Sequence, residues 1–378
     1  MTLWPTVDFA SAVEDVTGGN VKTLESDYLD EGPYPIVDQG QKRVAGHTSD
    51  PKRLVRSRGP LIVFGDHTTC FKYLDEPFAL GADGVKVLRP KTGFDAKFLY
   101  HYLSTRRLPH VGYSRHFKFL KQVSIPAPPY EEQQRISEVL DRAEALRKRR
   151  RKALALLDDL TRSIFIDMFG DFRGNYVTTN DGLVHPGGWN WVALSDLATL
   201  ATGHTPHRSR GDYWGGGIPW ISLPEIRGLD GQIANGTVLT IAPAGVTNSS
   251  AVVLPEGTVC LSRTASLGFV TIMGRPMATS QDFVNWVVGD RLRPTYLMYA
   301  LLLSRSRLRA ISDGSTHKTI YMRIAERFRV LLPPLKPQIE FERRLQAVWR
   351  LQELQRSALS GAEVAISSLQ ERAFAGEL

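Results

Sequence analysis

The stretch IPAPPYEEQQRISEVLDRAEALRKRRRKAL, residues 125–154, decides the organisation of the chain, because a similar junction returns as LLPPLKPQIEFERRLQAVWRLQEL, residues 331–354. Each stretch begins with an apolar run, passes through a proline pair and continues into a segment dense in helix-forming residues. Proline interrupts a strand but is tolerated in the first turn of a helix. The pattern therefore predicts the same strand-to-helix junction twice in one chain.

A long helix is predicted after each junction. Between Pro129 and Gly170 there is no proline or glycine, and two glutamates in the first turn favour a helix start. Apolar residues then recur in alternating steps of three and four, as in a coiled coil. Two such helices are expected to pack as an antiparallel coiled coil. The first stripe is Ile136, Val139, Ala143, Leu146, Arg150, Ala153, Leu157, Leu160 and Ile164, and the second is Phe341, Leu345, Val348, Gln352, Gln355, Leu359, Ala362, Ile366 and Leu369.

The segments before the two junctions also match one another in order. The spacing between the copies is far too long for the short repeats of a solenoid, so duplication of a whole domain with its trailing helix is the better interpretation. Glycine, proline, aromatic and acidic positions correspond. The paired positions are Trp4 and Trp191, Pro35 and Pro219, Gly59 and Gly257, Asp83 and Asp282, and Phe98 and Tyr296.

We therefore predict an α+β fold in which two long helices join and separate two similar mixed α/β domains. Short β-branched runs between glycines and prolines predict the strands of each domain. The two copies are expected to be related by a pseudo-two-fold axis. The expected boundaries are 1–129 and 171–334 for the domains, and 130–170 and 335–378 for the spacer helices.

Composition narrows the class of partner and the compartment. Lys and Arg number 47 against 39 for Asp and Glu, and this net charge of +8 favours a polyanionic partner such as nucleic acid. Cys70 and Cys260 are the two cysteines, and without a CxxC or Cys/His cluster the sequence suggests neither a disulfide framework nor a structural zinc site. The first residues do not resemble a signal peptide and no apolar run reaches bilayer-spanning length, so we expect a cytoplasmic protein without a membrane partner.

Catalytic motifs are incomplete in this sequence. APPY, residues 127–130, resembles the tetrapeptide that holds the target amino group in methyltransferases, but Ala127 offers no acceptor for that group. WGGGIPW, residues 214–220, lacks the Lys-Ser/Thr that follows the glycines of a phosphate-binding loop. Asp66 and His67 have no second carboxylate at a useful spacing. We predict that the chain is not an enzyme and binds no cofactor or metal.

Polar loops are the candidate DNA-reading elements. Bases are read in the grooves by Arg, Lys, Asn, Gln, Ser and Thr side chains on elements that reach the base edges. A polar loop residue is more often simply solvated, but GYSRHFK and GSTHK, from Gly112 and Gly314, correspond in the two copies. The first-copy candidates are Gln39, Gln41, Lys42, Arg43, His47, Asp66, His67, Thr68, Thr69, Tyr113, Arg115, His116 and Lys118, and the second-copy candidates are Thr205, His207, Arg208, Arg210, Ser262, Arg263, Thr264, Ser280, Gln281, Thr316, His317 and Lys318.

The run RKRRRK, residues 147–152, puts positive charge on every side of the first long helix. It is either a solvated face or a contact with DNA phosphates or an acidic partner surface. The candidates for subunit docking or contact with the DNA backbone are Gln133, Arg147, Lys148, Arg149, Arg150 and Arg151.

Four segments resemble parts of the DNA specificity subunits of type I restriction-modification systems. Residues 125–171 are similar to the central conserved region of that family. GHTPHRSRGDYWGGGIPWIS and LSRTASLGFVTIMGRPMATSQDF, from Gly203 and Leu261, resemble one type of target recognition domain. IVFGDHTTCFKYLDEPFALGADGVKVL, from Ile62, resembles another.

The resemblance implies a DNA-recognition role without catalysis. Residues 1–129 and 171–334 would each recognise one half of a bipartite duplex DNA target, and the helices would dock two methyltransferase subunits and, further, restriction subunits. AdoMet, ATP and Mg would be bound by those partner subunits. Lys336 and Pro337 stand where the first copy has two glutamates, a departure at the second docking region. The alternatives are a non-catalytic coiled-coil scaffold, an orphan DNA-binding protein without restriction partners, and a self-contained DNA-modifying enzyme.

Overall fold

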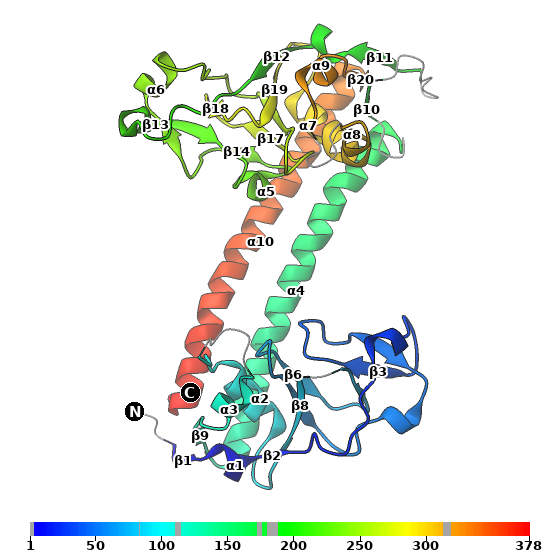
Figure 1. Ribbon diagram of the computed structural model, residues 1–378, viewed down its shortest axis with the longest axis vertical. Helices are drawn as coiled ribbons and strands as arrows, with labels where there is room; N and C mark the ends of the chain where they lie inside the picture. The colour runs from blue at the N-terminus through cyan, green and yellow to red at the C-terminus, as the bar shows by residue number, and fades with distance from the viewer. Residues whose placement is uncertain (1–3, 83, 110–114, 172–175, 180–187, 313–318) are drawn as a thin grey trace. The chain divides into compact units, whose positions relative to one another are not determined.

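The computed structural model describes residues 4–82, 84–109, 115–171, 176–179, 188–312 and 319–378. The chain forms two compact units, which we call unit 1 (residues 1–153 and 355–378) and unit 2 (residues 154–354). Each unit contains mixed α/β structure together with part of each of two long helices, α4 (Tyr130–Phe169) and α10 (Leu335–Ala375) (Figure 1). The α+β fold and both long helices agree with the sequence prediction.

Unit 1 is built on a four-stranded antiparallel sheet of order β2-β8-β5-β6. Unit 1 also contains a three-stranded sheet of order β4-β3-β7, in which β3 runs parallel to β7. All five residues of β5, LIVFG, are buried, as expected for the centre of a sheet covered on both faces. The strands are β1 (Thr6–Val7), β2 (Val13–Asp15), β3 (Tyr34–Val37), β4 (Gly46–Thr48), β5 (Leu61–Gly65), β6 (Phe71–Leu74), β7 (Ala79–Leu80), β8 (Val85–Pro90) and β9 (Ile125–Pro126).

Helix α2 and the last turn of α10 complete the core of unit 1. The Asp95 carboxylate caps α2 by accepting a hydrogen bond from the backbone N–H of Phe98 (2.8 Å). The ring of Phe374, near the end of the chain, lies 5.7 Å from that of Phe98 and 5.1 Å from that of Tyr102. Residues distant in sequence therefore share one core. The helices of this unit are α1 (Phe9–Ala12), η1 (Glu25–Asp27), η2 (Pro51–Arg53), α2 (Ala96–Ser104) and α3 (Phe117–Leu120).

Unit 2 has a five-stranded sheet of order β12-β19-β16-β17-β14 and a three-stranded sheet of order β15-β13-β18. A third sheet pairs β10 (Val177–Thr178) and β11 (Asn190–Ala193) with β20 (Arg329–Leu332). The other strands are β12 (Ala198–Thr202), β13 (Trp214–Ile221), β14 (Ile233–Ala234), β15 (Thr240–Ile241), β16 (Val259–Ser262), β17 (Val270–Met273), β18 (Ala278–Thr279) and β19 (Phe283–Val288). The helices are η3 (Leu194–Asp196), η4 (Gly211–Tyr213), α5 (Ile226–Leu229), α6 (Pro243–Thr247), α7 (Pro294–Leu303), α8 (Arg305–Ala310) and α9 (Met322–Ala325).

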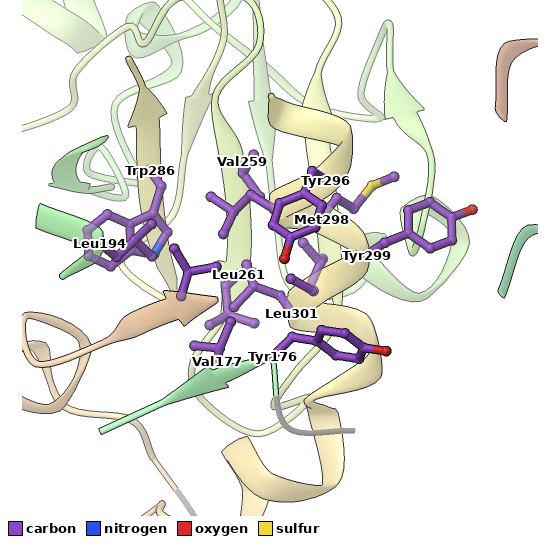
Figure 2. Close-up of a cluster of buried hydrophobic side chains, with 14 of the residues drawn as sticks. Tyr176, Val177, Leu194, Val259, Leu261, Trp286, Tyr296, Met298, Tyr299 and Leu301 are labelled. Atoms are coloured by element: carbon purple, nitrogen blue, oxygen red, sulfur yellow. The ribbon is translucent and has the colours of Figure 1, made fainter. Parts of the chain in front are cut away.

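Helix α7 packs across the five-stranded sheet and is almost entirely buried. In Figure 2 the side chains of Val259 and Leu261 on β16 lie between α7 and Trp286 on β19. The hydroxyl of Tyr296, whose ring is fully buried, donates to the backbone carbonyl of Leu331 (2.5 Å), so its one polar group is satisfied. Burial of these large side chains is the main stabilising contribution to this unit.

The two units repeat one topology, which confirms the internal duplication. β3 runs parallel to β7 as β13 runs parallel to β18, and Ile36 opposite Ala79 corresponds to Trp220 opposite Ala278. Gly59 and Gly257 were paired from sequence alone, and both adopt a positive φ, of 92° and 84°, just before the central strand. Of the other predicted pairs, that of Asp83 with Asp282 rests on a residue outside the described part of the chain.

A buried glutamine ties the start of α4 to unit 1. Gln133 is 1% exposed, and its side-chain carbonyl accepts a hydrogen bond from the backbone N–H of Asp95 (2.9 Å). Its amide nitrogen donates to the carbonyls of Pro128 (2.9 Å) and Gly93 (3.0 Å). The sequence marked Gln133 as a candidate docking residue. In the structure its amide is used entirely inside the unit, so we do not assign it to a partner surface.

Gln338 makes the same arrangement at the start of α10 in unit 2. It is fully buried, accepts from the backbone N–H of Arg293 (2.8 Å), and donates to the carbonyls of Pro333 (2.9 Å) and Arg291 (3.3 Å). The change from two glutamates to Lys336-Pro337 therefore leaves this hydrogen-bond arrangement intact.

Charged pairs reinforce each junction with different residues. In unit 1, Asp141 on α4 accepts from Lys97 Nζ (2.6 Å) and lies 2.8 Å from His101 Nε2. Burial of the Asp141 carboxyl would raise its pKa, but these hydrogen bonds hold the pKa below its usual value. In unit 2, Arg293 pairs with Glu342 (2.6 Å) instead.

Helices α4 and α10 pack antiparallel within each unit. In unit 1, Arg150 contacts Gln355 (3.2 Å), and Arg135 donates to the carbonyl of Leu378 (3.0 Å). In unit 2, Gln352 donates to Asp158 (2.7 Å), while the rings of Phe165 and Phe341 lie 5.2 Å apart. The interface between the two helices thus contains both polar and aromatic contacts.

The first half of the predicted α10 stripe is confirmed, whereas the α4 stripe is partly wrong. On α10 the predicted positions from Phe341 to Gln352 are buried. On α4, Leu146 and Leu160 are 47% and 42% exposed, while Leu140 and Phe165, which the prediction missed, are fully buried. An α-helix repeats every 3.6 residues, so a strict 3.5-residue pattern drifts off the packed face.

None of the helices in the described segments is both long and apolar enough to span a bilayer.

Replacing Gln133 with Ala should destabilise unit 1 by about 2 kcal/mol, because three backbone groups lose a buried partner. Hydrogen exchange should accelerate most at the Asp95 amide. The exposed neighbour Gln134 provides the control, since its replacement by Ala should leave both measurements unchanged. Unaltered protection at Asp95 in Gln133→Ala would contradict this role.

Candidate nucleic-acid interface

Two polar loops of unit 1 meet at the end of β5. One loop, residues 38–43, follows β3, and the other, residues 66–70, joins β5 to β6. The hydroxyl of Thr68 donates to the backbone carbonyl of Gln39 and so links them. A joined pair of loops presents its exposed side chains in a defined arrangement. The exposed candidates here are Gln41, Lys42, Arg43, Thr68 and Thr69.

Asp66 and His116 support the surface rather than forming it. Asp66 is 4% exposed, and its carboxylate accepts a hydrogen bond from the backbone N–H of Phe117 (2.7 Å). His116 is 3% exposed, with its backbone N–H (2.8 Å) and ring Nδ1 (3.0 Å) at the Asp66 carbonyl. Both were predicted as reading residues, but both are buried. They hold in place the segment that carries exposed Arg115 and Lys118.

A buried lysine that sequence reasoning missed holds the start of loop 38–43. Lys72 on β6 is 7% exposed, and its Nζ donates to the backbone carbonyl of Asp38 (2.8 Å) and lies 3.3 Å from the Asp38 carboxylate. That carboxylate also accepts from the N–H of Gly40 (2.9 Å). The detectable signal was the strand FKYL, in which Lys72 occupies the same inward-facing phase as Leu74.

His47 and Arg43 have partners within unit 1. His47 lies on β4, not in a loop, and its Nδ1 is 3.0 Å from the carbonyl of Asp30. Arg43 forms an exposed ion pair with Glu76 (3.1 Å), which costs little to open. His67 is half-buried. Tyr113 lies outside the described residues.

In unit 2 Gln281 joins three polar segments. Its exposed side chain accepts a hydrogen bond from the hydroxyl of Thr205 (2.6 Å), just after β12. Its backbone carbonyl accepts from Nε of Arg263 (2.9 Å), at the end of β16. The segments after β12, β16 and β18 therefore converge.

Asp282 holds two of these converging segments together. Its carboxylate accepts from the hydroxyls of Thr264 (2.8 Å) and Ser280 (2.9 Å). Ser280 is only 2% exposed, and Ser262 is fully buried, with its hydroxyl accepting from the N–H of Phe269 (2.9 Å). Ser262 and Ser280 were predicted as base contacts, but their burial makes them supporting residues.

Exposed cations and aromatic rings line the edge of this cluster. Arg210 forms a bidentate pair with Asp212 (2.9 and 2.8 Å), and Arg208 lies over the ring of Trp214, 6.0 Å from its centroid. His207 is also exposed, with Nδ1 2.9 Å from the Ser209 hydroxyl. These side chains are accessible to a partner without disturbing the core.

Corresponding hairpins, β5–β6 in unit 1 and β16–β17 in unit 2, each hold the segment that precedes a short helix. The carbonyl of Arg263 accepts from the N–H of Ile320 (2.9 Å), as the carbonyl of Asp66 accepts from His116 (2.8 Å). Each segment leads into α9 or α3. The candidates Thr316, His317 and Lys318 lie outside the described residues.

Half of the basic run 147–152 faces outward. The engaged cations are Arg147 with Glu144 (2.6 Å), Arg150 with Gln355 (3.2 Å) and Arg151 with Glu363 (2.7 Å). The others are exposed and form no ion pair with any residue that the structure describes. They are Lys148, Arg149 and Lys152.

Side chains that could bind a metal ion do not gather in the described segments. There, no group of three or more His, Cys, Asp and Glu side chains is placed to hold a metal ion. Cys260 is fully buried, and burial raises the pKa of its thiol.

Both copies of the duplication match one protein family. Residues 14–155 and 186–360 match the family described as "Type I restriction modification DNA specificity domain". The chain belongs to this family. A match to each copy fits a specificity subunit with two recognition domains, and it agrees with the prediction of a DNA-recognition subunit rather than an enzyme.

Known specificity subunits share parts of this sequence. The chain is 31% identical over 133 residues to a type I restriction enzyme specificity subunit from Methanocaldococcus jannaschii, an alignment that covers 35% of this chain and 31% of that protein. A specificity subunit from Escherichia coli is 23% identical over 343 residues, covering 82% of this chain and 78% of that one. The chain thus spans under a third of the first relative and most of the second.

Solved structures from type I restriction-modification systems share the fold. A type I restriction-modification S subunit from M. genitalium matches over 99% of this chain and 96% of its own, with a TM-score of 0.62 and 14% identity. A structure described as showing complex assembly and conformational transition of the type I R-M system matches over 99% and 98%, with a TM-score of 0.57 and 17% identity.

Replacing Lys72 with Met should free loop 38–43 while leaving the β5–β6 core folded, because Met fills the buried volume but cannot donate to Asp38. Hydrogen exchange at the Gly40 amide should accelerate about tenfold or more. Lys118→Met, at an exposed position, is the matched control and should leave the Gly40 rate unchanged. Full protection of Gly40 in a folded Lys72→Met protein would contradict the assignment.

Proposed function

We propose that this specificity subunit recognises a bipartite duplex DNA target, with one half-site read by the polar loops of each unit. The observation that supports this most directly is the repeated convergence of polar loops at the same hairpin in two copies of one topology. Two similar readers in one chain suit a target with two separated half-sites. A coiled-coil scaffold would not need either set of loops.

The division between exposed and buried polar residues supports base reading. Sequence-specific contacts require side chains that are held in place yet reach outward. In unit 2, Thr205, Arg263 and Gln281 are solvent-accessible, and the first two both donate hydrogen bonds to Gln281. The carboxylate of Asp282 and the buried serine hydroxyls hold the segments that carry them. Cations at the edge are suited to neighbouring phosphates.

Partner docking is the second part of the proposal. The same glutamine arrangement fixes the start of α4 in unit 1 and the start of α10 in unit 2. Two equivalent helix junctions suit the docking of two copies of a methyltransferase subunit, and restriction subunits would join that complex. AdoMet, ATP and Mg would belong to those partners. A complex that methylates or cleaves chromosomal DNA would be cytoplasmic in a cell without a nucleus.

We also assign the outward-facing cations of α4 to the DNA backbone. Lys148, Arg149 and Lys152 are exposed on neighbouring positions of the helix surface, whereas Arg150 packs toward Gln355. Contacts of Lys and Arg with phosphates add affinity at any sequence and release counterions. The docking alternative for this run predicts loss of a partner subunit without loss of DNA affinity.

Mapping methylated bases in cells should identify a split motif that requires this chain together with its methyltransferase. Exchanging residues 1–129 for the same region of another specificity subunit should change one half of the motif and retain the other, because each unit reads separately. Cells lacking the chain are the control. A change of both halves would contradict the two-reader model, and methylation that is independent of the chain would contradict the proposed function.

Combined replacement of Lys148, Arg149 and Lys152 with Ala should weaken binding of every duplex and reduce the salt slope by about one for each phosphate that is no longer neutralised. Arg115→Ala should instead cost about 1–3 kcal/mol at one half-site only. The control removes three exposed charges elsewhere, at Lys336, Arg343 and Arg344 on α10, and should leave the slope unchanged. Equal slopes for wild type and the α4 variant would exclude backbone contacts by this run.

A further inference from the structure

A polar hollow of about 540 Å³ opens beside the candidate interface of unit 2. It adjoins η4 and the end of α6, the short helix that lies next to β13 in Figure 1. Thr205 links the hollow to the polar segments that meet at Gln281, because its side chain lines the hollow and donates a hydrogen bond to Gln281 (2.6 Å). The lining residues are His204, Thr205, His207, Tyr213, Thr247, Asn248, Ser249 and Ser250.

The chemistry of this lining suits a base edge better than a phosphate. Every lining side chain carries a hydrogen-bonding group, and none is Lys, Arg, Asp or Glu. Affinity for phosphates comes mainly from Lys and Arg, whereas base edges are distinguished by patterns of donors and acceptors. The hollow therefore presents neutral hydrogen-bonding groups next to a surface already suited to DNA.

Most hydroxyls in the hollow are already used. Ser249 donates to the carbonyl of Gly245 (2.6 Å) and accepts from the N–H of Ala251 (3.1 Å). Thr247 donates to the carbonyl of Pro243 (3.0 Å). These side chains complete the turn at the end of α6 and have less capacity left for a ligand.

Asn248 is different, because one hydrogen bond orients its amide and leaves the rest available. Its Nδ2 donates to the carbonyl of Ala244 (2.9 Å), and a carbonyl can only accept, so this contact fixes which amide atom is nitrogen. A primary amide carries two N–H groups and one carbonyl. The second N–H and Oδ1 have no hydrogen-bond partner among the residues that the structure describes, and the side chain is exposed.

We propose that Asn248 reads an adenine in the half-site assigned to unit 2, a role that rests on the proposed function. Oδ1 accepts from the adenine N6 amino group, and Nδ2 donates to adenine N7. Of the four bases, adenine alone presents an adjacent donor and acceptor of this kind in the major groove. Guanine presents two acceptors there, so its O6 would face Oδ1 of Asn248 without a hydrogen bond and the two oxygens would repel each other.

The test measures binding of the full chain, in complex with its methyltransferase, to the duplex motif found by methylation mapping. Each adenine of the unit 2 half-site is replaced in turn by 7-deazaadenine, which lacks the N7 acceptor. At one position the analogue should weaken wild-type binding about tenfold. Asn248→Ala should bind the natural duplex about 10- to 100-fold more weakly and should no longer distinguish the analogue at that position.

A matched variant separates this effect from general damage. Asn235 is another exposed asparagine of unit 2, outside the hollow, so Asn235→Ala should retain wild-type affinity and wild-type sensitivity to the analogue. The salt slope of Asn248→Ala should equal that of wild type, because no cation is removed.

Two kinds of failure are distinguishable. If the wild-type complex shows no preference for any sequence, the proposed function itself is overturned. If it binds its motif selectively but no adenine in that half-site responds to the analogue, or if Asn248→Ala still responds, the assignment of Asn248 is overturned while the proposed function stands.

Discussion

A fully engaged glutamine amide at the start of each long helix is the interaction on which the arrangement of each unit depends. Gln133 binds one backbone N–H and two backbone carbonyls, and Gln338 repeats this set. Backbone groups buried without partners are costly, so these contacts leave little freedom for the angle at which the helix leaves the strand. The polar loops can hold a defined position relative to the helix in their own unit only because this junction is fixed.

The same separation of supporting and exposed polar groups governs the candidate interface. The charged groups of Lys72 and Asp66 in unit 1, and of Asp282 in unit 2, contact backbone, carboxylate or hydroxyl partners within their own unit. A loop held by such contacts has lost its conformational entropy before it meets a ligand, which lowers the cost of binding. Exposed neighbours such as Arg115 and Gln281 are then available for recognition.

The sequence predicted the elements that occur in both copies but did not predict which polar side chains are buried. The proline pairs, the long helices and the paired glycines follow from local chemistry, and each was recovered. Burial of His116, Ser262 and Ser280 depends on which segments fold over them, and their residue types are equally common in exposed loops. Lys72 was overlooked because a lysine in a short strand usually points to solvent. Asn248 lies in a polar stretch that is indistinguishable in sequence from an ordinary turn.

The two copies show which features the geometry requires and which it leaves open. Both keep the buried glutamine, but the reinforcing pair on the helix is Asp141 with His101 and Lys97 in one unit and Arg293 with Glu342 in the other. A neutral amide that satisfies backbone groups specifies direction, whereas a partly exposed ion pair contributes modest energy and can be exchanged. The helix junction can therefore stay constant while the rest of each unit differs. That is the physical condition under which two recognition surfaces in one chain can have different targets without disturbing the helices they share.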